Sequence, residues 1–303
     1  MDAAVSVGGV RVQGFPSRIG RRYRRDMINR PRRSVLYMPA TNAKAIAKAR
    51  ALPCDVVILD LEDAVAPDAK AAGREAALAA VREGGFGGRE LVVRVNAIDG
   101  PWGMDDCRAL AMVKPDAVLV PKVDDARGVG AYRDALGDLP IWVMVETMRA
   151  VLGIGELAGA ERLAALVVGT NDLAKEMRAR PGPDRAPFQG FLANTVAAAR
   201  ANGLAAIDGV YNAIDDVDGF AAECAQGLAF GFDGKTLIHP SQITTCNSVF
   251  SPTADEIAWA QTVVAAFDAP EAADKGVIRI EGRMVERLHL DQARQVLAIA
   301  AAL

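Results

Sequence analysis

The feature that most constrains the fold of this chain is a regular alternation of short apolar runs and alanine-rich stretches from Arg33 onward. The apolar runs are continuous and rich in β-branched residues, as in parallel strands that are buried on both faces. Eight such repeats in about 210 residues predict a closed (β/α)8 barrel, the TIM-barrel architecture. The predicted strands are Ser34–Tyr37, Val56–Asp60, Leu91–Val95, Ala117–Val120, Ile141–Val145, Ala165–Gly169, Ala205–Ile207 and Thr236–Ile238.

The stretches between these strands favour helices. A doubly wound open sheet is the alternative arrangement, but no G-x-G-x-x-G sequence follows the first predicted strand. We therefore expect a single barrel over residues 33–250. The clearest predicted helices are Ala43–Ala51, Ala69–Glu83, Ala126–Ala135 and Phe191–Ala201.

The two ends of the chain differ from the barrel. Residues 1–32 are rich in arginine and lack the apolar run of a secretory signal, so we interpret them as a flexible basic arm. The alternatives are that these residues form a transit peptide or that the natural protein starts at Met27. Residues 251–303 predict a helix to about Phe267, a hairpin at Val277–Val285 and a final helix at Leu290–Ala302. This tail lies beyond the eighth strand and is expected to be a lid or an oligomer contact.

The composition of the chain restricts the partners and the kinds of catalytic site that we expect. The formal net charge is -3 and no apolar run approaches the ~18 residues needed to cross a bilayer, so we expect neither nucleic acid nor membrane as a partner. Four scattered cysteines indicate a reduced, cytoplasmic protein. Only two histidines are present, which argues against a histidine-rich metal site and against a Ser-His-Asp triad. Chemistry should rest on carboxylates, arginine, lysine and a hard cation.

Polar residues follow the predicted strands at their carboxyl ends, which converge on one mouth in a barrel. A single Asp there is usually a helix N-cap, but six strands that end in charged or amide residues indicate a site. These residues are Asp60, Glu62, Asp63, Arg94, Asn96, Lys122, Glu146, Asn171, Asp172 and Asp208, and a histidine, His239, follows the eighth predicted strand.

Within this set, Glu146 and Asp172 end adjacent strands and predict a Mg²⁺ site, since Mg²⁺ takes one or two carboxylates and keeps several waters. A pair of N-caps or a salt-bridged rim is the alternative. Arg94 either pairs with Glu62 or Asp63 for stability or clamps a substrate carboxylate, and both roles are compatible with one site.

Six short motifs occur in an order that resembles the citrate lyase beta-subunit-like (CitE-like) proteins of the HpcH/HpaI aldolase superfamily. The resemblance runs from about Arg33 to the C-terminus. The motifs are Ser34-Val-Leu-Tyr-Met-Pro39, Ile58-Leu-Asp-Leu-Glu-Asp-Ala-Val65, Val93-Arg-Val-Asn96, Pro121-Lys-Val123, Gly169-Thr-Asn-Asp-Leu173 and Ile238-His-Pro-Ser-Gln-Ile243.

The resemblance implies a Mg²⁺-dependent barrel enzyme that acts on an acyl-CoA thioester and a 2-oxo acid. It also implies a homo-oligomer, a trimer or hexamer, whose lid reaches a neighbouring subunit's mouth. The resemblance implies Glu146 and Asp172 as Mg²⁺ ligands, Arg94 on the oxo-acid portion of the substrate, and Tyr37, Lys44 and Lys48 toward CoA. From the positions in the chain we also expect Arg94 to be catalytic, with Glu62 and Asp63 as catalytic residues that orient metal-bound water and the guanidinium. Glu146 and Asp208 are expected to contact the substrate. For Lys44 and Lys48, a solvated helix face is the alternative.

The tail departs from the family pattern. Many relatives have Gly-x-Met-Val/Ile-Asp-x-Pro, whose Asp carries the catalytic proton. This chain has Glu286 at the Asp position and Leu288-His289 after it. A bacterial subgroup with Glu-x-Leu-His at this point includes malyl-CoA thioesterases. A surface pairing of Glu286 with Arg283 or Arg287 is the alternative to a catalytic role.

Four functions remain open from the sequence. The leading prediction is a lyase that breaks the C–C bond of a malyl-CoA, citramalyl-CoA or citryl thioester by retro-Claisen cleavage, giving acetyl-CoA and a 2-oxo acid. The alternative is a (3S)-malyl-CoA thioesterase on the same site. A citrate lyase beta subunit in a complex, and a pyruvate-dependent aldolase without CoA, are the remaining two.

Overall fold

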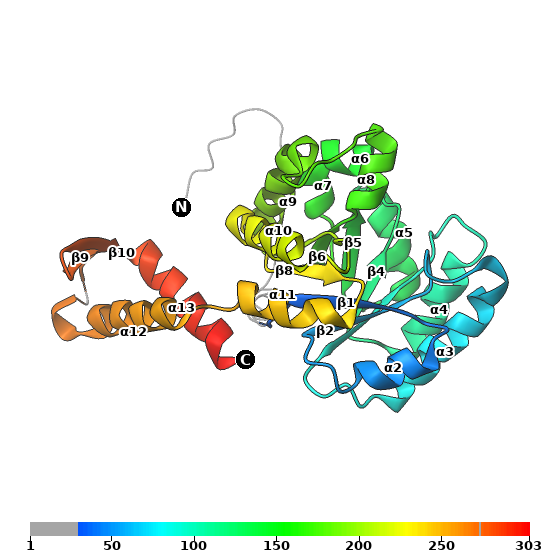
Figure 1. The fold of residues 1–303 in the computed structure, drawn as a ribbon, viewed down its shortest axis with the longest axis horizontal. Coiled ribbons are helices and arrows are strands. Elements are labelled where there is room, and N and C mark those ends of the chain that lie inside the picture. The colour runs from blue at the N-terminus through cyan, green and yellow to red at the C-terminus, as the bar shows by residue number, and fades with distance from the viewer. Residues whose placement is uncertain (1–29, 273) are drawn as a thin grey trace, which may run out of the picture.

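The computed structural model describes residues 30–272 and 274–303 of the chain, so most of the predicted basic arm lies outside the described residues. Eight parallel strands close into a barrel in sequential order, which confirms the (β/α)8 prediction (Figure 1). Each strand pairs with the next, and β8 pairs with β1. The strands are β1 (Ser34–Pro39), β2 (Val56–Asp60), β3 (Glu90–Arg94), β4 (Ala117–Val120), β5 (Ile141–Val145), β6 (Leu163–Val168), β7 (Ala205–Asp208) and β8 (Gly234–Leu237).

Helices connect the strands and cover the outside of the barrel (Figure 1). Several begin at a side-chain cap, such as Asn42, Asp125, Thr147 and Asp216, whose oxygens accept a backbone N–H of the first turn. The barrel helices are α2 (Ala43–Ala49), α3 (Lys70–Glu83), α4 (Gly103–Val113), α5 (Ala126–Leu136), α6 (Met148–Leu152), α7 (Ile154–Ala158), α8 (Thr170–Met177), α9 (Gln189–Asn202), α10 (Val217–Phe230) and α11 (Ile243–Phe250).

Two apolar layers hold the barrel together. Side chains that point inward, among them Ile58, Leu119 and Trp142, fill the barrel interior. The alternate residues of the same strands, such as Leu36 and Val143, pack outward against the helices. Burial on both strand faces explains why the strands read as continuous apolar runs in the sequence.

The base of the barrel is fixed by ion pairs at the amino ends of the first strands. Arg32 donates to both carboxylate oxygens of Glu90 at 2.6 and 3.0 Å, and its guanidinium lies 5.3 Å from the Trp142 ring centroid. Arg33 pairs with Asp55 at 2.8 Å. Arg32 is buried, so this residue belongs structurally to the barrel and not to an arm.

The C-terminal segment packs on itself and projects beside the barrel (Figure 1). It consists of α12 (Ala254–Asp268), the antiparallel strands β9 (Val277–Ile280) and β10 (Arg283–Glu286), and α13 (Arg287–Ala301). The final helix starts three residues before the predicted Leu290, because Glu286 already has extended backbone and caps it. Its apolar core is separate from the barrel core and comprises Ala260, Val263, Phe267, Ile280, Val285, Leu290 and Ala293.

Over residues 30–272 and 274–303, none of the helices is both long and apolar enough to span a bilayer.

Candidate active site

Arg94 is the centre of an ion-pair cluster at the barrel mouth. The parallel register places it directly opposite Asp60, and its Nε and Nη2 donate to the two Asp60 oxygens at 2.7 and 2.6 Å. Its Nη1 lies 2.8 Å from Glu62 Oε2 and 3.6 Å from Asp63 Oδ2. The sequence-based pairing with Glu62 or Asp63 is therefore present, but Asp60 makes the two-pronged contact that fixes the guanidinium plane.

Tyr37 lies beneath this cluster. Its ring centroid is 4.9 Å from the Arg94 guanidinium carbon, and its hydroxyl donates to Met144 Sδ at 3.4 Å. Burial raises the pKa of the Tyr37 phenol. This residue was predicted to contact CoA, and the structure places it as a support under the guanidinium. The contact with CoA stays a prediction.

Glu62 is buried at the mouth, whereas Asp63 beside it is largely exposed. Burial raises the pKa of Glu62 to about 8, although the charge of Arg94 acts in the opposite direction. The Glu62 Oε2 atom lies 2.8 Å from Arg94 Nη1, but the geometry is not that of a hydrogen bond. The two groups therefore attract each other electrostatically, while Oε2 accepts no hydrogen bond from the described residues. A carboxyl group in this state can hold a proton near neutral pH.

The stability of the metal-free chain should therefore fall as pH rises through the range between 4.5 and about 8. Over that range the unfolded chain has already released the Glu62 proton, whereas the folded chain must give up a proton from a buried site. We expect Glu62→Gln to remove this pH-dependent loss in the free energy of unfolding, which is on the order of 1–3 kcal/mol. Urea unfolding in EDTA at pH 5 and pH 8 measures it, with exposed Asp63→Asn as the control. An identical pH dependence in wild type and Glu62→Gln would contradict the assignment.

The predicted metal pair comes together at the ends of β5 and β6. Glu146 is 1% exposed, and its Oε1 accepts the backbone N–H of Lys122 at 2.8 Å. The Lys122 ammonium lies 2.8 Å from Asp172 Oδ1 and 3.3 Å from Glu146 Oε1. Burial raises the pKa of Glu146, although the charge of Lys122 opposes this shift. Both carboxylates thus face one small volume that holds positive charge.

The residues of this volume fit a Mg²⁺ ion. Glu146 Oε2 is buried and accepts no hydrogen bond from the described residues, so a ligand position is open. A Cβ on Gly169 would lie 3.0 Å from that oxygen, and glycine keeps the space clear. Residues 30–272 and 274–303 contain no group of three or more His, Cys, Asp or Glu side chains suited to a metal. Two carboxylates with waters in the other positions are a usual Mg²⁺ environment.

Lys70 supports the mouth, a role that is not predicted from the sequence. Its buried ammonium donates to the backbone oxygens of Leu61 and Glu62 at 2.8 and 2.7 Å and to Asn96 Oδ1 at 2.7 Å. These three bonds join the loops after β2 and β3. Lys70 is the second residue of the predicted alanine-rich helix Ala69–Glu83, and nothing in the sequence distinguishes it from a lysine on a solvated helix face.

Asp208 lies in a different environment from the other mouth carboxylates. Asp208 is the last residue of β7, and its side chain is fully buried. It pairs with Arg185 at 2.8 Å and with Lys235 at 3.0 Å. Lys235 in turn contacts Glu223 at 2.6 Å. Two cations hold the pKa of Asp208 low despite its burial. The structure thus gives Asp208 a structural role in the barrel wall, and its predicted contact with substrate stays a prediction.

Lys44 and Lys48 are exposed on α2, one helical turn apart, directly after β1 and thus on the mouth side of the barrel. His239 caps the short helix after β8, and its Nδ1 lies 2.7 Å from Ser241 Oγ. Asn171, next to Asp172, exchanges amide hydrogen bonds with Asn212.

Glu286 is not brought to the mouth of its own barrel. It is the N-cap of α13, and the other end of this helix, at Ala302 and Leu303, lines a hollow at the barrel base with Arg33 and Asp55. A helix of this length separates the two ends by roughly 20 Å. His289 Nδ1 accepts the backbone N–H of Glu286 at 2.9 Å and fixes the start of the helix.

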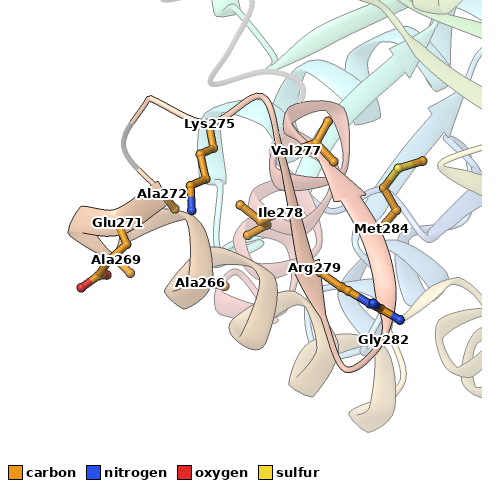
Figure 2. A pocket seen from close by; sticks show the side chains of 10 residues that line it. All are labelled: Ala266, Ala269, Glu271, Ala272, Lys275, Val277, Ile278, Arg279, Gly282 and Met284. Carbon is orange, nitrogen blue, oxygen red and sulfur yellow. The ribbon is translucent and has the colours of Figure 1, made fainter.

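The tail also carries a groove of about 850 Å³, lined by residues of α12 and of the β9–β10 hairpin (Figure 2). Val277, Ile278 and Met284 supply its apolar lining, while Lys275 and Arg279 add basic groups. Glu271 adds an acidic group to the same groove, so the tail presents a mixed apolar and charged surface.

Sequence comparison decides the family. Residues 33–240 match the family described as HpcH/HpaI aldolase/citrate lyase. The chain belongs to this family. It is 47% identical over 273 residues to a (3S)-malyl-CoA thioesterase of Cereibacter sphaeroides (strain ATCC 17025 / ATH 2.4.3), covering 90% of this chain and 96% of the relative. It is 32% identical over 283 residues to citrate lyase subunit beta of Escherichia coli (strain K12), covering 89% and 94%.

Among solved structures, this HpcH/HpaI family member is similar to the protein CitE from Mycobacterium tuberculosis, determined in complex with magnesium, acetoacetate and coenzyme A. The TM-score is 0.74 at 31% identity, and the match covers 90% of this chain and 99% of CitE. These findings confirm the predicted resemblance and the barrel fold. They favour the thioesterase alternative over the lyase, because the more similar relatives carry that name.

Proposed function

We propose that this chain is a Mg²⁺-dependent thioesterase that hydrolyses a malyl-CoA-type thioester at the Glu146–Asp172 mouth. The observation that carries the proposal is the 47% identity to (3S)-malyl-CoA thioesterases over nearly the whole chain. It agrees with the Glu286-x-Leu288-His289 sequence of the tail, which departs from the Asp-x-Pro pattern of many lyase relatives.

The proposed reaction breaks the C–S bond. A water oxygen adds to the thioester carbonyl carbon while a carboxylate takes the water proton, and the CoA sulfur then leaves and receives that proton. Arg94, fixed by Asp60, binds the carboxylate of the malyl group and holds it against the mouth. Mg²⁺, when bound, supplies Lewis-acid stabilisation of negative charge on substrate oxygens.

We propose that Glu286 of another copy of the chain supplies this carboxylate, which makes the enzyme a homo-oligomer. On its own barrel, Glu286 lies at the far end of α13 from the barrel base. Arg283 and Arg287, the partners in the surface-pair alternative, lie over the rings of Trp259 and Phe267 on α12, at 5.2 and 5.9 Å.

Glu286→Gln should lower kcat by roughly 10²–10⁴ while substrate binding is retained, because the amide keeps the size of the side chain but cannot accept the proton. Glu281→Gln in the turn of the same hairpin is the matched control. Mixing Glu286→Gln chains with Glu146→Ala chains should restore activity, since a mixed oligomer contains some intact mouths next to intact tails. A fully active Glu286→Gln variant would leave the role to Glu62 or Asp63.

The phosphates of CoA are proposed to bind Lys44 and Lys48. Lys44→Glu with Lys48→Glu should raise KM for the thioester about tenfold with kcat within about twofold, because such contacts act equally on the ground state and the transition state. Lys114→Glu at the opposite end of the barrel is the control. An unchanged KM would indicate that the two lysines form only a solvated helix face.

A second candidate function is the C–C lyase on the same site, supported by the similarity to citrate lyase beta subunits. In that reaction the 3-hydroxyl loses its proton, the C–C bond breaks, and the thioester enolate takes up a proton to give acetyl-CoA and a 2-oxo acid. Release of free thiol from malyl-CoA in Mg²⁺, and its loss in EDTA, tests the thioesterase proposal. Accumulation of glyoxylate without free thiol would favour the lyase.

A further inference from the structure

Lys122 is held by its backbone as well as by its side chain. It lies two residues beyond the end of β4 and has a left-handed backbone, with φ of 53°, which lysine rarely adopts. This conformation lets its N–H donate to Glu146 Oε1 at 2.8 Å while its ammonium returns to the same carboxylate and to Asp172. A strained backbone conformation that is retained at a candidate active site indicates that the position of this residue matters for function.

The ammonium balances charge that would otherwise be costly. Glu146 is almost fully buried, and one of its oxygens accepts no hydrogen bond from the described residues. A buried carboxylate without a counter-ion is strongly unfavourable. The Lys122 ammonium lies 3.3 Å from Glu146 Oε1 and 2.8 Å from Asp172 Oδ1, so it stands where the proposed Mg²⁺ would bind.

The Lys122 side chain is also free to leave this place. It is 36% exposed, whereas Glu146 has no exposed side-chain surface, so the ammonium can turn toward solvent or toward a bound anion without disturbing the core. Glu146 remains in place because its Oε1 accepts the Lys122 N–H, and Asp172 is carried by the first turn of α8.

We propose that Lys122 is a positioning residue that holds Glu146 and Asp172 beside each other through its ammonium and that Mg²⁺ must displace. This inference rests on the proposed function, since it takes the same pair as the Mg²⁺ site. It predicts that part of the Mg²⁺ affinity is lost in displacing the ammonium. Removal of that ammonium should therefore tighten Mg²⁺ binding, even though it harms the metal-free chain.

The test is calorimetric titration of MgCl₂ into the full-length chain after dialysis against EDTA, for wild type and Lys122→Met. We expect Mg²⁺ to bind Lys122→Met about tenfold more tightly, because a competing unit charge within hydrogen-bond distance has been removed. Lys175→Met, which removes an exposed lysine of α8 near Asp172, controls for the general change in charge and should alter the affinity by less than about twofold.

Thermal unfolding supplies a second readout that does not depend on activity. Lys122→Met should have a lower Tm than wild type in EDTA and a larger gain in Tm on addition of MgCl₂. Equal or weaker Mg²⁺ binding by folded Lys122→Met would overturn the inference but leave the Mg²⁺ site of the proposed function intact. Absence of Mg²⁺ binding by both proteins would overturn the metal site itself.

Discussion

Glu146→Ala and Asp172→Ala should each lower kcat/KM for the thioester by roughly 10³-fold or more while the chain stays folded. Each change removes one of two carboxylates that face the same volume, and with it the charge that would hold Mg²⁺. Steady-state kinetics at saturating MgCl₂, with circular dichroism for the fold, measures the effect.

Asp215→Ala is the matched control, because Asp215 is an exposed acid on the loop after β7. It should retain near wild-type kinetics. If Glu146→Ala or Asp172→Ala kept near-normal activity in EDTA, the pair would be a salt-bridged rim around Lys122 and the metal assignment would be wrong.

Arg94→Lys should be almost as damaging as Arg94→Ala, with kcat/KM lowered roughly 10²–10³-fold. The guanidinium contacts Asp60 with two nitrogens and Glu62 with the third, and a single ammonium cannot reproduce that planar arrangement. Kinetics should be measured together with Tm, because loss of a buried ion pair also destabilises the fold.

The control for this pair is Arg149→Lys, a conservative change at an exposed arginine of α6, which should leave both kinetics and Tm unchanged. An Arg94→Lys enzyme within a few-fold of wild type would reduce Arg94 to a structural partner of Asp60. In that case another cation of the mouth would have to bind the substrate carboxylate.

The barrel could be predicted because each strand is apolar on both faces and each connection is alanine-rich, so the alternation itself encodes the architecture. The Glu146–Asp172 pair followed from the same logic, because the carboxyl ends of neighbouring strands converge. The Arg94–Asp60 pairing could also be predicted from the sequence. Both residues end adjacent parallel strands, and alignment of those strands places them opposite each other.

Other features depend on side-chain direction, which the sequence does not reveal. Asp208 ends β7 much as Glu146 follows β5, yet it turns outward to Arg185 and Lys235. Lys122 owes its position to a left-handed backbone that is rare for lysine. The location of Glu286 relative to a barrel mouth depends on where the tail packs. Because the tail has an apolar core of its own, separate from the barrel core, its sequence does not specify which barrel it packs against.

Thioester hydrolysis and C–C cleavage differ in which bond of malyl-CoA breaks, and this can be followed in H₂¹⁸O with Mg²⁺ present. A thioesterase should give free CoA and malate in equal amounts, with one ¹⁸O in the newly formed carboxylate and no acetyl-CoA or glyoxylate. Accumulation of acetyl-CoA and glyoxylate without label in malate would contradict the thioesterase proposal and assign the site to C–C cleavage.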